Sequence, residues 1–290
     1  MRVILSRKGF DSKNGGVPSP IFSDRSLVSL PIPCDDENGP PSFESLRNQS
    51  TDLGALVEDL TQHRQKRIPG NRSVHLDPDL DHSIQPRPAG WRPAFGQVRS
   101  AQGHLANQGV ERGDLFLFFG WFRQVERVGG TWRYVKGSPN IHVLFGWLQI
   151  EEIWSFATQY EAAVARHPWL ETHAHADIEL DSNTVYVSRP RLKLNGKASD
   201  TPGAGAFRKF DAALQLTWPN ETRRWWRLPR WFEPVNGKPP LSYHLKRDAW
   251  RRREGFMQLR TVGIGQEFVL DCDHYPEAVE WAAELIERHQ

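Results

Sequence analysis

The first twenty residues place chemically reactive side chains directly after a short apolar run. Residues 3–5 are apolar and predict a buried strand. The loop that follows carries Lys8 and Asp11 and then two adjacent glycines, Gly15 and Gly16. Loops of this composition bring backbone N–H groups and a basic side chain close to an anion, often a phosphate. We therefore predict an anion-binding loop, and the alternative is a solvated surface turn.

The chemistry of each side chain suggests its role in this loop. Lys8 is expected to hold a phosphate, and Asp11 to orient Lys8 or to act as a general base. The alternative for this pair is a surface ion pair of little energetic weight. The residues expected to bind substrate in the same loop are Ser6, Arg7, Gly15, Gly16 and Ser19.

A second candidate is the run His75, Asp77, Asp79 and Asp81, in which a possible ligand stands at every other position. Alternate residues of an extended strand share one face, so these side chains are expected to point together at a divalent cation. We assign the metal to Asp77 and Asp79, and we also expect His75 and Asp77 to bind substrate. The alternative is a solvated acidic loop with turn-forming aspartates.

Histidines supply further candidates. His173 and His175 form an H-x-H pair, which on a strand would place both imidazoles on one face, and His167 lies just before them. A third zinc ligand with standard spacing is missing nearby, so surface histidines are the alternative. His104 lies in a segment expected to be helical and is our third catalytic candidate, with a structural role as its alternative.

Residues 222–260 combine basic and aromatic side chains. This stretch holds eleven Lys and Arg against three Asp and Glu, with four Trp among them. Arg contacts phosphate and Trp stacks on unpaired bases, so the stretch predicts a nucleic-acid interface. The alternative is that the Trp residues are core and the Arg residues are solvated. The expected contact residues are Arg223, Arg224, Trp225, Trp226, Arg227, Arg251, Arg252 and Arg253.

Strands and helices must alternate irregularly to position these groups. Apolar runs predict strands at 115–122, 142–153, 183–187 and 266–270, and helical spacing predicts helices at 52–65, 102–110, 153–167 and 276–288. We expect an α+β fold with a central mixed sheet, or a partly closed barrel like PUA and ASCH domains by analogy, with flanking helices. We expect one domain over 1–290, divisible into a loop-rich part (1–95), a β-rich core (96–200) and a basic, Trp-rich part (201–290).

Composition excludes several classes of protein. The chain has 290 residues, ordinary globular hydrophobicity and only two cysteines, so a disulfide framework is not expected. Apolar runs of membrane-spanning length and a signal-peptide core are missing, and we expect a cytoplasmic protein without a membrane partner. The motifs of P-loop kinases, serine hydrolases and zinc deaminases are also missing from the sequence.

Several segments resemble the nucleotide modification associated domain, third type. They are SRKGFDS and LVSLPIP near the start, HLDPDL at 75–80, AQGHL and GDLFLFFGWFR within 101–123, NTVYVS at 183–188 and GQEFVLD at 265–271. The resemblance spans nearly the whole chain and implies a DNA base hypermodification protein. It implies DNA or a nucleotide as partner, together with other base-modification enzymes, and it favours the assignments at His75, Asp77 and His104.

The sequence therefore predicts recognition or modification of a nucleobase or nucleotide, with the N-terminal loop as ligand site. If the chain is an enzyme, we expect a transferase. One alternative is a non-catalytic, PUA-like reader of a modified base, and a weaker one is a metal-dependent nuclease that uses the acidic run. The cofactor stays unknown at this stage, and the acidic run admits a divalent metal.

Overall fold

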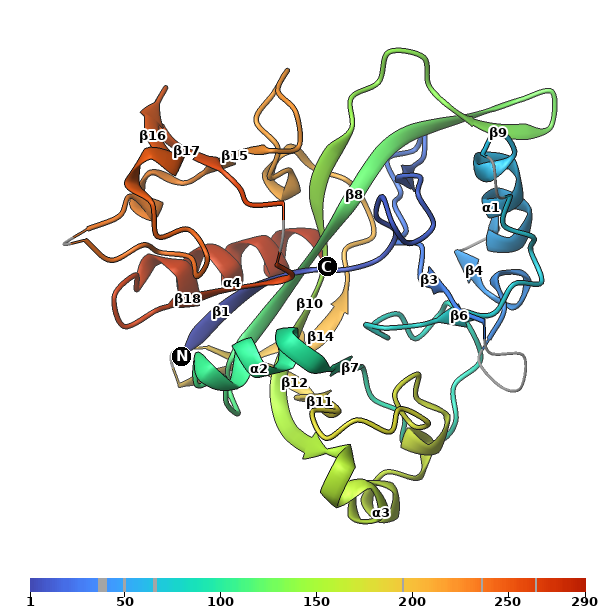
Figure 1. The fold of residues 1–290 in the computed structure, drawn as a ribbon, viewed down its shortest axis with the longest axis horizontal. Coiled ribbons are helices and arrows are strands. Elements are labelled where there is room, and N and C mark those ends of the chain that lie inside the picture. Colours follow the sequence, from blue (N-terminus) through green and yellow to red (C-terminus); the bar gives the residue numbers. More distant parts are fainter. Residues whose placement is uncertain (36–40, 49–50, 65–66, 195, 236, 264) are drawn as a thin grey trace.

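The computed structural model describes residues 1–35, 41–48, 51–64, 67–194, 196–235, 237–263 and 265–290. Over these residues the chain is mixed α/β, with one large mixed sheet and four α-helices around it (Figure 1). None of these helices is long and apolar enough to cross a membrane. The expectation of a central mixed sheet with flanking helices is confirmed.

The main path of the large sheet runs β18-β1-β8-β10-β11-β7, and three short strands, β14, β2 and β9, join it from the side. β1 is parallel to β8 and antiparallel to β18, which makes the sheet mixed. The strands are β1 Arg2–Arg7, β2 Ser19–Ile21, β7 Ala94–Gln97, β8 Leu115–Val128, β9 Thr131–Tyr134, β10 Ile141–Ser155, β11 Thr184–Ser188, β14 Ala204–Ala206 and β18 Glu267–Asp271.

Burial on both faces explains the apolar runs of the central strands. Residues 3–5 of β1 are at most 1% exposed; β18 and β8 pair with the strand on either side, and α4 packs on it. The first six residues of β8 and the first ten of β10 are likewise buried. A strand covered on both faces has a continuous apolar sequence in place of alternation. The core therefore surrounds β1, and the polar loop after β1 starts from a fixed point.

The four α-helices lie close to the segments that apolar spacing predicts. α4 buries Ala278, Ala282 and Ile286, spaced four apart, and packs on β1. Asp52 caps α1 by accepting a hydrogen bond from the backbone N–H of Ala55. The helices are α1 Leu53–Thr61, α2 Arg99–Asn107, α3 Phe156–Arg166 and α4 Glu277–His289.

Four smaller sheets complete the described structure. The basic and aromatic stretch forms a separate three-stranded antiparallel sheet in the order β15-β17-β16. The other pairs are β3-β6, β4-β5 and β12-β13. Their bounds are β3 Ile32–Pro33, β4 Arg47–Asn48, β5 Thr51–Asp52, β6 Val74–His75, β12 Arg191–Leu194, β13 Lys197–Pro202, β15 Trp225–Leu228, β16 Trp250–Arg253 and β17 Phe256–Arg260.

Backbone pairing does not close the sheet into a barrel over the described residues, because its path ends at β18 and β7. Side chains nevertheless join these two edge strands. Gln97 of β7 donates a hydrogen bond from Nε2 to Oε1 of Glu267 in β18, at 2.7 Å. The sheet is therefore strongly curled, and its two edges meet beside the end of β1.

Candidate functional site

A cavity of about 140 Å³ lies where β1 ends. Six separate segments of the chain line it: the loop after β1, Ile32, the residues at and after β6, the end of β7, the segment 175–178 and Gln266. Its polar and charged lining residues are Arg7, Lys8, Asp11, Asn14, His75, Asp77, Gln97, His175 and Gln266. The structure thus brings part of the predicted loop together with part of the predicted acidic run.

Lys8 forms a buried ion pair on one side of this cavity. Its Nζ lies 2.9 Å from Oε1 of Glu267, and the two side chains are 8% and 0% exposed. The ammonium also lies over the ring of Phe95, at 4.5 Å from its centroid. Oε2 of Glu267 has no hydrogen-bond partner among the described residues. Glu267, and not Asp11 as the sequence suggested, orients Lys8.

Asp11 is bound to its own loop. Its Oδ1 accepts hydrogen bonds from the backbone N–H groups of Lys13 and Asn14, both at 2.7 Å. Side chains of Asp commonly stabilise tight turns in this way. The carboxylate still lines the cavity, and the Asx turn holds it there. The predicted Lys8–Asp11 pair is therefore wrong, whereas the placement of both residues at one cavity is observed.

Arg7 adds positive charge to the cavity. Its Nη2 donates to the carbonyl oxygens of Gly265 and Gly263, at 2.6 and 3.2 Å. Burial lowers the pKa of Arg7, while the charges of Asp11 and Glu267 act in the opposite direction. Burial also lowers the pKa of Arg223, and the charge of Arg7 lowers it further. Two guanidinium groups therefore lie near each other at this end of the molecule.

The two serines assigned to substrate binding are buried outside the cavity lining. Ser6 and Ser19 are 0% and 1% exposed. Ser19 Oγ accepts a hydrogen bond from the backbone N–H of Leu30 at 3.0 Å, so it stabilises the fold of the loop. Ser6 belongs to β1, and its Oγ is buried without a hydrogen-bond partner among the described residues. Neither serine lines the cavity, so the geometry gives no support to their assignment to substrate binding.

The two glycines have a packing role. Gly15 and Gly16 adopt φ of 75° and 70°, a region that favours glycine. A Cβ on Gly15 would meet the ring of Phe10, and a Cβ on Gly16 would meet the guanidinium of Arg64, which also bonds the Gly16 carbonyl oxygen. Neither glycine lines the cavity. Close packing of the loop, and not a cradle for an anion, accounts for this Gly-Gly pair.

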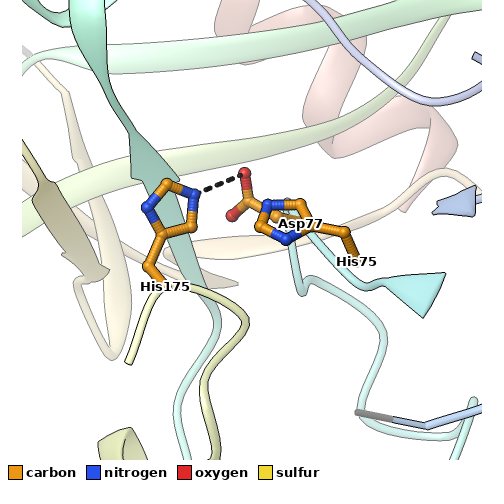
Figure 2. A group of neighbouring side chains, drawn as sticks. All are labelled: His75, Asp77 and His175. Atoms are coloured by element: carbon orange, nitrogen blue, oxygen red, sulfur yellow. Dashed lines mark ion pairs between the residues drawn. The ribbon is translucent and has the colours of Figure 1, made fainter. Parts of the chain in front are cut away.

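Three side chains form a compact cluster in the cavity: His75, Asp77 and His175 (Figure 2). One ligand atom from each lies within 4.8 Å of the others. His175 Nε2 is 3.7 Å from Oδ2 of Asp77, and the two imidazole centroids are 5.1 Å apart. The H-x-D and H-x-H pairs, far apart in the sequence, each contribute to this cluster.

Neighbouring groups hold the cluster in place. The backbone N–H of Gly96 donates to Oδ1 of Asp77 at 2.7 Å. Nδ1 of His175 lies 2.8 Å from Oδ1 of Asn183, whose amide nitrogen donates to the carbonyl oxygens of His175 and Ile178. Because that amide oxygen is an acceptor, we assign the His175 proton to Nδ1. Its Nε2 then faces the Asp77 carboxylate.

Burial sets the charges in the cluster. It lowers the pKa of His75, and it lowers that of His173, which lies next to the cluster, to about 3, although Asp77 acts in the opposite direction. Burial alone would raise the pKa of Asp77, but the neighbouring histidines, His175 most of all, outweigh it and lower that pKa to about 2. A carboxylate beside two imidazoles is a donor set for a metal ion.

The rest of the acidic run points elsewhere. β6 ends at His75, so the run does not form one strand with a shared face. Asp79 accepts a hydrogen bond at 2.7 Å from Nη1 of Arg87, and Asp81 accepts one at 2.8 Å from Nη1 of Arg208. Asp79, which we expected to bind a metal, is therefore paired with an arginine and does not belong to the cluster of His75, Asp77 and His175.

The remaining histidine candidates lie outside the cavity lining. His104, on α2, has Nε2 2.9 Å from Oγ of Ser242 and stacks on Tyr243 with centroids 4.1 Å apart. His167 has Nε2 3.0 Å from Oε2 of Glu152. Neither imidazole reaches the cluster, so the catalytic role expected for His104 lacks geometric support.

Side chains along β15 alternate between buried and partly exposed positions. Trp226 is 0% exposed and donates from Nε1 to Nδ1 of His142 at 3.0 Å. It is a core residue, and its assignment to a nucleic-acid interface is wrong. Trp225 and Arg227 alternate with it and are partly exposed. Arg224 and Arg251 are exposed, and Arg251 lies over the ring of Trp225 at 5.8 Å.

Two other arginines that were predicted to contact nucleic acid form ion pairs with glutamates. Arg252 pairs with Glu233 at 2.5 Å, and Arg253 pairs with Glu221 at 3.2 Å. Arg223 lies over the ring of Trp121, 4.0 Å from its centroid. The exposed charge of this surface is therefore smaller than the count along the sequence indicates.

Sequence reasoning missed Glu267, Gln97 and Asn183. Glu267 begins a strand whose next three residues are apolar, and a charged residue in such a place is a signal for a buried partner. Asn183 and Glu267 both lie in segments that carry the family resemblance noted above. The pairing of Gln97 with Glu267 had no signal in the sequence, since it depends on the curl of the sheet.

One comparison with known proteins gives a result. The family model described as nucleotide modification associated domain 3 matches residues 2–271. No curated protein and no solved structure matches the chain. The match covers all six segments that line the cavity.

Proposed function

The chain belongs to the nucleotide modification associated domain 3 family, which implies a role in DNA base modification pathways, and from this premise we propose that its cavity binds and modifies a nucleobase or nucleotide. One observation carries the proposal. A single cavity combines the cations Arg7 and Lys8 with the cluster of His75, Asp77 and His175. Convergent polar groups with shifted pKa values in a cavity are the usual mark of a functional site.

The size of the cavity supports a small ring as its occupant. It measures about 140 Å³. A protein cavity of about 150 Å³ takes one benzene ring. A single base therefore fits better than a whole nucleotide, and a base would have to leave its stack to enter. Arg7 would then hold a phosphate near the opening, since guanidinium groups bind phosphate in two-pronged fashion.

A second set of residues would hold the rest of the nucleic acid. Arg223 lies near enough to Arg7 for the charge of Arg7 to lower the pKa of Arg223. The guanidinium of Arg223 also stacks on the ring of Trp121. From there, Arg224 and Arg251 continue the positive charge onto the sheet β15-β17-β16. This surface provides phosphate contacts and one partly exposed tryptophan, Trp225, for stacking.

Within this function, a transferase acting on the base is our first candidate. The competing candidate is a PUA-like reader that binds a modified base without turnover, which the same cavity would serve. A nuclease is less well supported. Asp79 and Asp81 accept hydrogen bonds from Arg87 and Arg208, so Asp77 is the one aspartate of the acidic run that lines the cavity.

Mass spectrometry of DNA nucleosides from cells with and without the gene tests the proposal. We expect a modified nucleoside only when the gene is present. Removing Lys8 alone would leave Glu267 buried and unpaired, so the site variant is Lys8→Met with Glu267→Gln. The control is Lys13→Met, an exposed lysine in the same loop.

The site variant should abolish the modified nucleoside, and the control should retain it. An identical nucleoside profile with and without the gene would refute the proposal as an enzyme. In that case, tight binding of the purified protein to DNA that carries a modified base would establish the reader.

A further inference from the structure

The cluster contains two acceptors that face each other. Asn183 fixes the proton of His175 on Nδ1, so Nε2 presents a lone pair. At 3.7 Å from it lies Oδ2 of the Asp77 carboxyl group. Both atoms are buried, with side chains 4% and 5% exposed. Two buried acceptors at this distance need a cation between them, either a proton or a metal ion.

We propose that His75, Asp77 and His175 bind one first-row divalent transition-metal ion in the cavity. This inference deepens the proposed function, because the ion would lie in the cavity proposed to bind the base. It is tested separately from that function, by metal binding alone.

The separation of the ligand atoms suits such an ion. Tetrahedral ligands about 2.1 Å from zinc lie about 3.4 Å from one another. The distance of 3.7 Å between His175 Nε2 and Asp77 Oδ2 is close to this value. The third ligand atom lies within 4.8 Å of both, so a small rotation of the His75 side chain completes the set. His75 is the least buried of the three, and rotation there is the least hindered.

The groups behind the ligands are those that metal sites use. A ligating histidine commonly donates its other N–H to an oxygen, as His175 does to Asn183. The backbone N–H of Gly96 fixes Oδ1 of Asp77 and leaves Oδ2 free to bind the ion. His173 Nε2 is buried without a hydrogen-bond partner among the described residues, 4.0 Å from Oδ1 of Asp77. It is a further polar group aimed at the cluster.

The ligand types select the kind of metal. Two imidazoles and one carboxylate suit Zn²⁺ or Fe²⁺, and this set with open positions is the arrangement of non-haem iron oxygenases and of catalytic zinc sites. Mg²⁺ and Ca²⁺ prefer all-oxygen sites. Three protein ligands leave coordination positions for water or substrate on the side of the cavity lined by Lys8 and Asp11.

The experiment measures metal binding by the full-length chain. The protein is titrated anaerobically with Zn²⁺, Fe²⁺ and Mg²⁺, and bound metal is counted by elemental analysis after gel filtration. We expect one equivalent of Zn²⁺ or Fe²⁺ and at least a hundredfold weaker binding of Mg²⁺. Asp77→Asn and His175→Gln should each weaken transition-metal binding at least a hundredfold.

Asp81→Asn and His82→Gln are the matched controls, since they remove the same side-chain types a few residues away. Both should bind metal as the wild type does. If a cluster variant fails to fold, Co²⁺ is added to the wild-type protein as a substitute experiment. We then expect d–d absorption bands and shifted imidazole resonances of His75 and His175. Substoichiometric metal in the folded wild type with no cobalt spectrum would overturn the proposal and leave a buried imidazolium–carboxylate pair.

Discussion

At the scale of single residues, Gly96 is the tightest point of the site. Its N–H bonds Asp77, and a Cβ at this position would lie 2.2 Å from the His175 ring. No real Cβ contact is that short, so the imidazole would have to move. Glycine here lets β7 approach the cluster closely, which is one of the recognised reasons for glycine within a strand.

Gly96→Ala should therefore weaken metal binding without touching a ligand atom. Displacing a ligand from its position typically costs 10–100-fold in metal affinity, and we expect a loss in that range. Zinc titration by calorimetry measures it. Gly103→Ala in α2 is the control, because a Cβ there meets nothing within 4 Å. Equal affinities of wild type and Gly96→Ala would show that His175 is not held as described.

His244, which is outside the cavity lining, couples stability to pH. Its Nε2 accepts from the N–H of Val262 at 3.3 Å, and Nδ1 lies 2.9 Å from the carbonyl oxygen of Ser242. Burial lowers its pKa to about 4, although the hydrogen bond to Ser242 acts in the opposite direction. Because the folded pKa is below the unfolded value, protonation favours unfolding, so this contribution is full above pH ~6.5 and is lost as pH falls toward 4.

The wild type should consequently lose about 2 kcal/mol of unfolding free energy through His244 between pH 8 and pH 5. His244→Asn should be less stable at pH 8 but should show a smaller loss between the two pH values. Urea unfolding at both pH values gives the comparison, and His63→Asn, at an exposed position, should behave as the wild type. Parallel pH dependence of wild type and His244→Asn would disprove this coupling.

The residue types of the site could be predicted, but their grouping could not. His75 and Asp77 were expected to bind together, and His175 was considered separately because a third ligand was missing nearby in the sequence. The contact between them forms only after the segment 173–178 packs on the end of β7. In the same way, Asp79 has the residue type of a ligand, but Arg87 lies close enough in space to neutralise it.

At the scale of elements, the sheet β15-β17-β16 separates free arginines from paired ones. Arg224 and Arg251 are exposed, and no ion pair is recorded for them among the described residues. Arg252 and Arg253 form ion pairs with glutamates, which partly neutralise their charge. An arginine that must first leave an acidic partner contributes less to phosphate binding.

Replacing Arg224 and Arg251 with Ala should therefore weaken DNA binding more than replacing Arg252 and Arg253. Each lost phosphate contact lowers the dependence of log K on log salt by about 0.9, so the first pair should reduce the slope by about 2. Fluorescence anisotropy over a salt series measures it. If both double variants keep the wild-type slope while folded, the sheet is not the contact surface.

Helices and central strands were largely predictable at this scale, and loops were not. An amphipathic helix shows its period in the sequence, as α4 does, and a strand buried on both faces shows a continuous apolar run, as β8 does. The role of Gly15 and Gly16 was misread because glycine permits both an open anion cradle and close packing. Only the position of Phe10 and Arg64 decides between the two.

At the scale of the whole molecule, a bound ion would link distant parts of the chain. His75 and Asp77 lie at and just after β6, whereas His175 lies in the segment before β11. The ion would therefore join two parts of the chain that are far apart in the sequence. A ligand that binds only the folded state stabilises it by about 2.7 kcal/mol at a hundred times its dissociation constant.

Zinc at that concentration should therefore raise the melting temperature of the wild type, measured by calorimetric scanning. Asp77→Asn should show no rise, and Asp81→Asn should show the full rise. A rise that is the same in all three proteins would mean that zinc acts at some other site.

The bridge from Gln97 to Glu267 has a consequence for how copies of this protein mature. Glu267 is translated after every residue that lines the cavity. A nascent chain that stops before β18 leaves Lys8 without its counter-charge and the two sheet edges unjoined. The cavity is thus completed only by the last strand of the sheet to be translated, so a chain that ends before β18 is expected to lack a complete cavity.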